Sequence, residues 1–452
     1  MIRPPTWTAL AALVLPVFAV ACSPTGLPVA PPSVALPDPP RAAAAPPVDD
    51  APAAESRRKV RAMLARVAAA RGLPAKHEVA IRVLDRAGIL AAIRAHVDKE
   101  TPAAAVEHEG ELLAALELVP PSYDFVEGTY ALIQGRIAGF YEPGDQTMYL
   151  VDDLGDAEAA ETLAHELDHA LQDQSFPLAA MIEYVPGEGD RTSAVHAVLE
   201  GDATSAMLDV VAGSAFAVSE GALRTLLAAS NALSDVGATT PHVLQASLSA
   251  PYSDGFGFVQ RERTAGGWAA VDAALRSPPV STEQLLHADK YASREPPIPV
   301  PVPGLAALGP GFRAVLDDVI GEQGLRLMLE EWASPPVAER GAAGWGGDRY
   351  VIARRDDAAG AHTIAVGWHA VMDTERDAVE LADILEKRFG KPCRERPALG
   401  PLGYRRRGRT VVVAAGPYRR QGTATAAAGT CAGAEKWIEE LLRGSVDADH
   451  RP

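Results

Sequence analysis

Residues 165–169 read His-Glu-Leu-Asp-His, within a segment, 157–174, whose apolar residues recur at helical spacing. Histidines at i and i+4 of a helix lie one turn apart on one face, close enough to share a metal ion. The glutamate between them would lie beside that ion, where a metal-bound water needs a base. The pentapeptide therefore predicts a buried helix that binds zinc through His165 and His169, with Glu166 as the general base.

A second helix, predicted over 191–211, offers the third ligand. A catalytic zinc site takes three protein ligands and leaves one position for water, and a single helix cannot provide all three. Glu200 lies in an otherwise apolar run, where an unpaired carboxylate would be costly to bury, and the small Gly201 and Ala203 leave room for close approach of the motif helix. We therefore expect Glu200 to be the third ligand, with His196, one turn earlier, as its competitor.

Further polar residues could support such a site. Asp173, at i+4 from His169, and Asp202 are both candidates to accept a hydrogen bond from a ligand histidine. His287 and Tyr291 lie one turn apart downstream and are candidates for the donor that stabilises an oxyanion opposite the metal. Their spacing alone does not single them out.

On the N-terminal side of the motif, the spacing of the apolar residues changes from that of a helix to that of a strand. Segments 137–141 and 147–151 flank a Pro-Gly turn and predict a β-hairpin directly before the metal-binding helix. An exposed edge of that hairpin could bind an extended peptide by adding it to the sheet. Upstream, we expect a helix over 57–71, a strand over 77–84 and a helix over 87–97.

The longer run from Thr162 to Phe176 resembles a group of bacterial and archaeal proteins, many of them exported, that are described mainly as HExxH-containing zinc metallopeptidases. The resemblance covers roughly residues 60–291. It includes segments 138–141, 199–203 and 281–284 together with His287 and Tyr291. The resemblance implies a gluzincin-like site with zinc on His165, His169 and Glu200 and with Glu166 catalytic, but it implies no particular substrate. Asp168 departs from the pattern, since a small or apolar residue is more familiar there.

The N-terminus has the pattern of an export signal. A short apolar run, 7–21, ends in Ala-Val-Ala before Cys22, which resembles a bacterial lipobox with Cys22 as the lipid-bearing residue. A secretory signal cleaved near Ala21 is the alternative. Residues 23–56 are rich in Pro and Ala and predict an extended tether. We expect an exported protein of the cell envelope, anchored by lipid to a membrane at its periplasmic or outer face.

The C-terminal part has a sequence pattern typical of a separate α+β domain. A Pro-rich connector and helix, 296–340, precede a small α+β domain over 341–446. The expected helices are 311–332, 375–389 and 432–442, and the expected strands are 349–354, 363–370 and 410–415. We expect two helices over a small antiparallel sheet. In an exported protein, Cys393 and Cys431 are more readily explained as a disulfide than as reactive thiols.

Composition limits the partners of the chain. Its 452 residues include 42 Lys and Arg against 59 Asp and Glu, a formal net charge of −17, and no basic patch stands out, which argues against nucleic acid.

The predicted fold class is α+β: a mainly helical, zincin-like catalytic domain over 57–295, with a small β-hairpin or sheet, and the C-terminal domain. The predicted function is a peptidase with one zinc ion that acts on a peptide or protein. The alternatives are a non-catalytic, metal-stabilised envelope lipoprotein and a hydrolase of a non-peptide amide.

Overall fold

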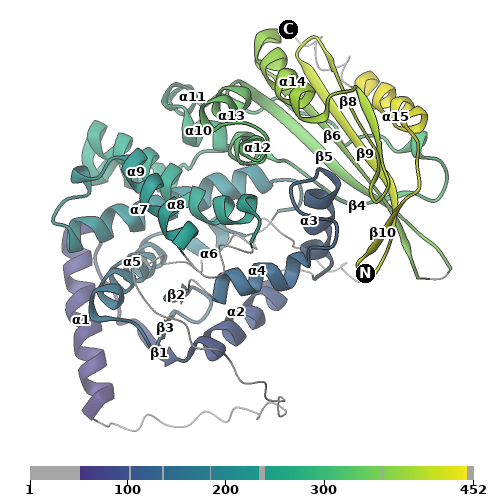
Figure 1. Cartoon of the computed structure of the whole chain (residues 1–452). Coiled ribbons are helices and arrows are strands. Elements are labelled where there is room, and N and C mark those ends of the chain that lie inside the picture. The colour runs from purple at the N-terminus through teal and green to yellow at the C-terminus, as the bar shows by residue number, and fades with distance from the viewer. Residues whose placement is uncertain are drawn as a thin grey trace, which may run out of the picture.

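The computed structural model describes residues 51–444 except 101–102, 135–136, 184, 234–239 and 359 (Figure 1). It has a mainly helical N-terminal part with a small sheet and a C-terminal part built on a larger sheet, so the α+β class is confirmed. No helix of the described residues is both long and apolar enough to span a membrane. Cys22 and most of the predicted tether lie outside the described residues. The end of the tether was predicted wrongly, because the first helix already begins at Ala51.

The N-terminal part contains one three-stranded sheet surrounded by helices (Figure 1). In chain order its elements are α1 (Ala51–Arg71), β1 (Ala80–Leu84), α2 (Arg86–Glu100), α3 (Ala103–Ala115), α4 (Phe125–Gln134), β2 (Gly139–Glu142), β3 (Thr147–Val151), α5 (Asp156–Ser175), α6 (Leu178–Met181), α7 (Gly189–Val211), α8 (Glu220–Leu233), α9 (His242–Arg276), α10 (Thr282–Leu286) and α11 (Ala288–Ser293). Strand β3 lies between β1, which is parallel to it, and β2, which is antiparallel. The predicted hairpin, the strand before it and the helix of the His-Glu-Leu-Asp-His motif are confirmed.

Helices α5, α7 and α9 form the frame of this part. Leucines of α5 and apolar residues of α7 share one core, which fixes how these two helices cross. On its other side α7 contacts α9 through two glycines: a Cβ at Gly201 would clash with the backbone of Gly255, and a Cβ at Gly255 would clash with the carbonyl of Ala197. Gly201 was expected to admit the motif helix, but the helix that comes close at this glycine is α9.

The C-terminal part is built on a seven-stranded antiparallel sheet. Its elements are β4 (Arg313–Asp318), α12 (Gly321–Glu330), α13 (Pro335–Ala342), β5 (Trp345–Asp356), β6 (His362–Met372), α14 (Glu375–Phe389), β7 (Cys393–Arg396), β8 (Gly400–Arg407), β9 (Thr410–Gln421), β10 (Ala424–Ala427) and α15 (Cys431–Gly444). The strand order is β4-β5-β6-β9-β8-β7, and β10 pairs with β9. Helix α14 packs in the core on one face of the sheet and α15 in a separate core on the other (Figure 1).

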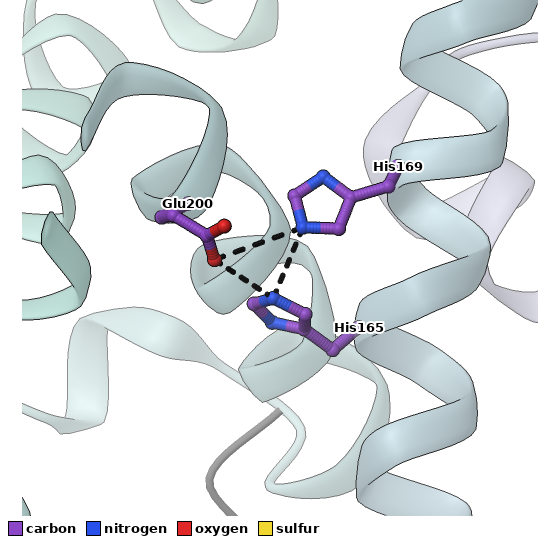
Figure 2. A group of neighbouring side chains, drawn as sticks. All are labelled: His165, His169 and Glu200. Carbon is purple, nitrogen blue, oxygen red and sulfur yellow. Dashed lines mark hydrogen bonds and ion pairs between the residues drawn. The ribbon is translucent and has the colours of Figure 1, made fainter. Parts of the chain in front are cut away.

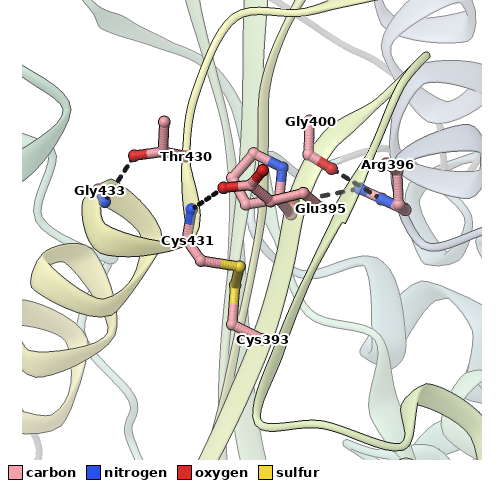
Figure 3. The surroundings of a disulfide bond; sticks show 8 residues. Cys393, Glu395, Arg396, Gly400, Thr430, Cys431 and Gly433 are labelled. Atoms are coloured by element: carbon pink, nitrogen blue, oxygen red, sulfur yellow. Dashed lines mark hydrogen bonds between the residues drawn. A yellow bond between two sulfur atoms is a disulfide. The ribbon is translucent and has the colours of Figure 1, made fainter.

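Two predictions for this part need correction. The helix expected over 311–332 is wrong in its first part, because Arg313–Asp318 pairs with β5 as the edge strand β4 and the helix begins only at Gly321. Strands β7 and β8 were not predicted. Cys393 at the start of β7 is joined to Cys431 at the start of α15, with 5.8 Å between their Cα atoms, so the disulfide fastens this helix to the sheet (Figure 3).

The two parts share one hydrophobic core, which runs from α2, α3 and α4 into the C-terminal sheet. Polar contacts join them at the beginning of α7. Asp318 at the end of β4 accepts the Gly189 N–H at 2.8 Å, and Arg349 of β5 donates to the Gly187 carbonyl at 2.8 Å. The C-terminal sheet therefore holds the first residues of the helix that carries Glu200.

A buried histidine in the sheet should make stability depend on pH. His369 of β6 is 2% exposed, and its Nε2 atom has no hydrogen-bond partner among the described residues. Burial lowers the pKa of His369 from its ordinary value of 6.5 to about 4. Between these values the unfolded His369 binds more protons than the folded one, so the contribution of His369 to the free energy of unfolding should fall by roughly 2–3 kcal/mol as the pH drops from 7.5 to 4.5. Chemical denaturation of the wild type and His369→Gln at both pH values measures this; an equal loss in both would contradict it.

Candidate metal centre

His165, His169 and Glu200 come together in the interior of the N-terminal part (Figure 2). The two histidine Nε2 atoms are 3.2 Å apart, and Glu200 Oε2 lies 3.1 Å from His165 Nε2 and 3.7 Å from His169 Nε2. All three side chains are at most 5% exposed. Two imidazole nitrogens and a carboxylate oxygen are typical metal ligands, so this buried group is able to bind a metal ion.

The helices place the three ligand atoms. His165 and His169 extend from consecutive turns of α5, and Glu200 reaches them from α7, as Figure 2 shows. The neighbouring His169, His165 and His196 together outweigh burial and hold the pKa of Glu200 well below its usual range. Glu200 is therefore an anion facing the two histidines.

His196 lies behind Glu200 instead of beside the other histidines. Its Nε2 atom is 3.0 Å from Glu200 Oε1, the carboxylate oxygen other than the one that faces His165. His196 is 5% exposed. The geometry therefore puts Glu200 in the group of ligand atoms and makes His196 the residue that orients it.

The partner of His169 is Gln172, not either of the predicted aspartates. Gln172 Oε1 lies 2.9 Å from His169 Nδ1, while Gln172 Nε2 donates to Asp202 Oδ2 at 3.0 Å, to the Leu199 carbonyl at 3.0 Å and to Asp168 Oδ2 at 3.2 Å. Since the amide nitrogen faces three acceptors, the amide oxygen must face His169. Nδ1 of His169 therefore carries a proton, which leaves Nε2 as the ring atom available to a metal ion.

Asp202 and Asp173 each have another function in the structure. Asp202 supports Gln172 and pairs with the fully buried Arg71, whose Nε lies 2.6 Å from Asp202 Oδ1. Asp173 accepts a hydrogen bond from the Tyr141 hydroxyl at 2.9 Å. The expectation that one of these aspartates contacts a ligand histidine was wrong, because Gln172 occupies the position between His169 and Asp202.

Glu166 lies next to the ligand group with one free oxygen. Its Oε2 accepts the Tyr141 N–H at 2.8 Å, and its Oε1 is buried without a hydrogen-bond partner among the described residues. Burial raises the pKa of Glu166 to about 8, against the opposing effect of His169. This carboxyl is therefore able to take up a proton near neutral pH.

The strand edge beside the motif helix is not open. Gly139, Phe140 and Tyr141 of β2 are buried, and the Tyr141 N–H already donates to Glu166. A cavity lined by Tyr141, His169 and His196 has a volume of about 10 Å³, which is room for about one water molecule. The expected exposed edge is thus absent from this conformation of β2.

Tyr252 of α9 is a member of the site that was not predicted from the sequence. Its ring lies 5.7 Å from that of His165, and its side chain is 5% exposed. Burial, followed by the charges of Glu200 and Glu166, raises the pKa of Tyr252 well above its usual value. A neutral hydroxyl is therefore held at the ligand group. No motif spacing marks Tyr252, because it reaches the site only through the close contact of Gly201 with Gly255.

His287 and Tyr291 have their contacts elsewhere. His287 Nε2 is bonded to Glu322 at 2.8 Å. The Tyr291 hydroxyl donates to the Ser277 carbonyl at 3.0 Å, and its ring packs edge-on against Phe258. The contacts that the structure gives these two side chains therefore lie outside the ligand group, and their predicted catalytic role has no contact to support it.

Comparison with known proteins concerns the C-terminal sheet. Residues 312–426, which run from the start of β4 to β10, match the model of a family described as Domain of unknown function (DUF8575). A search of curated proteins and a search of solved structures each found no match. The matched segment lies C-terminal to every residue of the metal centre, so the chain is similar to this family in its C-terminal part alone.

Proposed function

We propose that this protein is a zinc-dependent peptidase in which His165, His169 and Glu200 hold the metal and Glu166 is the general base. The observation that carries the proposal is the position of the unpartnered Glu166 Oε1 next to three converging ligand atoms. The resemblance of the extended motif to HExxH zinc metallopeptidases supports the same reading. The substrate we propose is a peptide or protein, with one zinc ion per chain.

The ligand atoms fit zinc. Zinc lies about 2.0–2.2 Å from imidazole nitrogen and carboxylate oxygen, so tetrahedral coordination separates neighbouring ligand atoms by about 3.3 Å. The three separations here are 3.2, 3.1 and 3.7 Å. Calcium and magnesium prefer oxygen ligands, whereas two of these three atoms are imidazole nitrogens. The donor set therefore favours zinc over the hard divalent cations.

Each side chain then has a defined task. Zinc at this position would supply a water of lowered pKa and would polarise a substrate carbonyl. Glu166 would accept a proton at its unpartnered Oε1 atom and would pass it to the leaving amine. His196 keeps Glu200 turned toward the histidines, and Gln172 keeps His169 in the tautomer that can bind metal. The Tyr252 hydroxyl is the donor available to an oxyanion.

Tyr252→Phe tests the role of the tyrosine hydroxyl. The change keeps the ring beside His165 but removes the donor, so we expect kcat to fall by about 10²-fold with little change in zinc content. Tyr291→Phe is the matched control, because its hydroxyl bonds to the Ser277 carbonyl. Steady-state kinetics on one peptide substrate compares the two variants. A larger loss in Tyr291→Phe would assign the oxyanion donor to Tyr291 instead.

Gln172→Leu tests the support of His169. Without the acceptor at Nδ1 the imidazole loses its fixed tautomer, so zinc affinity should fall by about 10- to 100-fold. Competition with a chromogenic chelator measures the affinity directly. An unchanged affinity in a folded variant would show that the Gln172 contact has no part in metal binding.

The burial of the site favours a second candidate, a metal-stabilised binding or structural module without turnover. Structural zinc sites are closed, whereas catalytic ones keep a position open, and here the ligands are at most 5% exposed beside a cavity of about 10 Å³. The test is incubation of the zinc-loaded protein with a diverse peptide mixture, followed by mass spectrometry. New peptide termini support the peptidase; their absence, with unfolding on zinc removal, supports the alternative.

We also propose that the chain acts outside the cytoplasm, attached to a membrane by lipid on Cys22. The support is the sequence pattern around Cys22 and the disulfide between Cys393 and Cys431, since disulfides persist in oxidising compartments. Metabolic labelling with a palmitate analogue in a bacterial host should mark the wild type but not Cys22→Ser. Equal labelling would contradict the lipid anchor.

A further inference from the structure

A second cavity, of about 190 Å³, lies at the junction of the two parts of the molecule. It is lined by residues of α3, the beginning of α7, α9, β4 and α12. Most of its lining is aliphatic, for example Leu112, Leu113, Leu116, Leu244 and Leu327. An engineered apolar cavity of about 150 Å³ holds benzene, so this space accommodates a phenyl ring with a small substituent.

Two carboxyl groups also line this cavity. Asp318 is 5% exposed and accepts the N–H groups of Gly189 and Val319, each at 2.8 Å. Glu109 of α3 has neither a hydrogen bond nor an ion pair to any residue that the structure describes. Burial, together with the charge of Asp318, raises the pKa of Glu109 to about 8. No Lys, Arg or His is found among the described residues of the lining.

An aliphatic lining with two carboxyl groups limits which kinds of ligand fit this cavity. A charge-assisted hydrogen bond from a cation would satisfy Glu109 and relieve its repulsion with Asp318. A divalent metal ion is a poor match, because it requires about six oxygen ligands and most of this lining is hydrocarbon. An organic cation with an apolar body matches both the carboxyl groups and the leucines.

We propose that the cavity is a binding site for a primary amine that carries one apolar group about the size of a phenyl ring. The ammonium group lies at Glu109 and Asp318, and the apolar group packs among the leucines. The site is separate from the small cavity beside His169, with which it shares no lining residue. It therefore does not depend on the proposed zinc chemistry.

Isothermal titration calorimetry of the full chain with benzylamine and with benzyl alcohol tests the proposal. The two probes have nearly the same shape, but only the amine is charged. We expect benzylamine to bind at least tenfold more tightly than benzyl alcohol. Glu109→Gln should remove this difference, whereas Glu107→Gln, an exposed glutamate on the same helix, should keep it.

A cavity-filling variant makes the test independent of Glu109. Leu113→Phe reduces the space among the leucines and should weaken both probes by at least tenfold. Equal binding of the two probes, or no binding at millimolar concentration, would overturn the proposal. Benzylamine binding that both Glu109→Gln and Leu113→Phe leave unchanged would place the amine elsewhere, for example at the metal centre, and would also overturn it.

Discussion

Glu166→Gln is expected to lower the rate of peptide hydrolysis by about 10²- to 10⁴-fold while the protein keeps its zinc. The amide has nearly the shape of the carboxyl and can still face the Tyr141 backbone, but it cannot take a proton from a metal-bound water. Glu166 is not among the three ligand atoms that converge, so metal binding should survive. Steady-state kinetics together with metal analysis of the same sample measures both quantities.

Glu161→Gln is the control for this variant. Glu161 lies on the same helix, α5, but is partly exposed. The control should keep both activity and zinc. Full activity in Glu166→Gln would rule out Glu166 as the base, and simultaneous loss of zinc would mean that Glu166 supports the metal itself.

Arg71→Met is expected to cost about 3–5 kcal/mol of folding free energy, the largest stability effect that we predict. Arg71 is fully buried at the end of α1, where its Nε and Nη2 atoms pair with Asp202 at 2.6 Å and Asp272 at 2.8 Å. Its guanidinium also lies 4.4 Å from the Trp268 ring centroid. Removing this cation leaves the buried Asp202 without a positive partner. The neighbouring Asp168 then adds repulsion, because two close carboxylates disfavour each other's charge.

Urea denaturation of the zinc-loaded protein measures the effect, with Arg61→Met as the control on the same helix. Arg61 pairs with Glu78, but both side chains are more than 60% exposed, so its loss should cost less than about 1 kcal/mol. Because Asp202 holds Gln172, Arg71→Met should also weaken zinc binding. Similar costs for the two arginine variants would contradict the role of Arg71 as a buried partner of Asp202.

The parts of the site that depend on local geometry could be predicted from the sequence. Two residues at i and i+4 of a helix lie on one face, so His165 and His169 had to lie together. Glu200 was identified because it is an isolated carboxylate in an apolar run. Gln172 and Tyr252 could not be found in this way. Gln172 supports His169 only because Asp202 and the Leu199 carbonyl approach from α7, and Tyr252 depends on a contact between two glycines 54 residues apart in the numbering, Gly201 and Gly255.

The same distinction explains the errors in the fold. Helix 375–389 was predicted with its full length, because the spacing of its apolar positions is a local signal. Residues 313–318 gave no such signal, since a six-residue edge strand is defined by its pairing with β5 and not by its own pattern. Asp173 and Asp202 show why the partners of polar residues could not be predicted. Their positions in the sequence are close to the ligand residues, but tertiary contacts decide which groups they bind.

The most direct test of the central claim is the zinc content of the purified protein, measured by inductively coupled plasma mass spectrometry after dialysis against a weak chelator. We predict one zinc ion per chain in the wild type and in His196→Ala, and almost none in Glu200→Ala. A wild type that retains no zinc, or a Glu200→Ala protein that keeps zinc while His196→Ala loses it, would contradict the assignment of His165, His169 and Glu200 as the metal ligands.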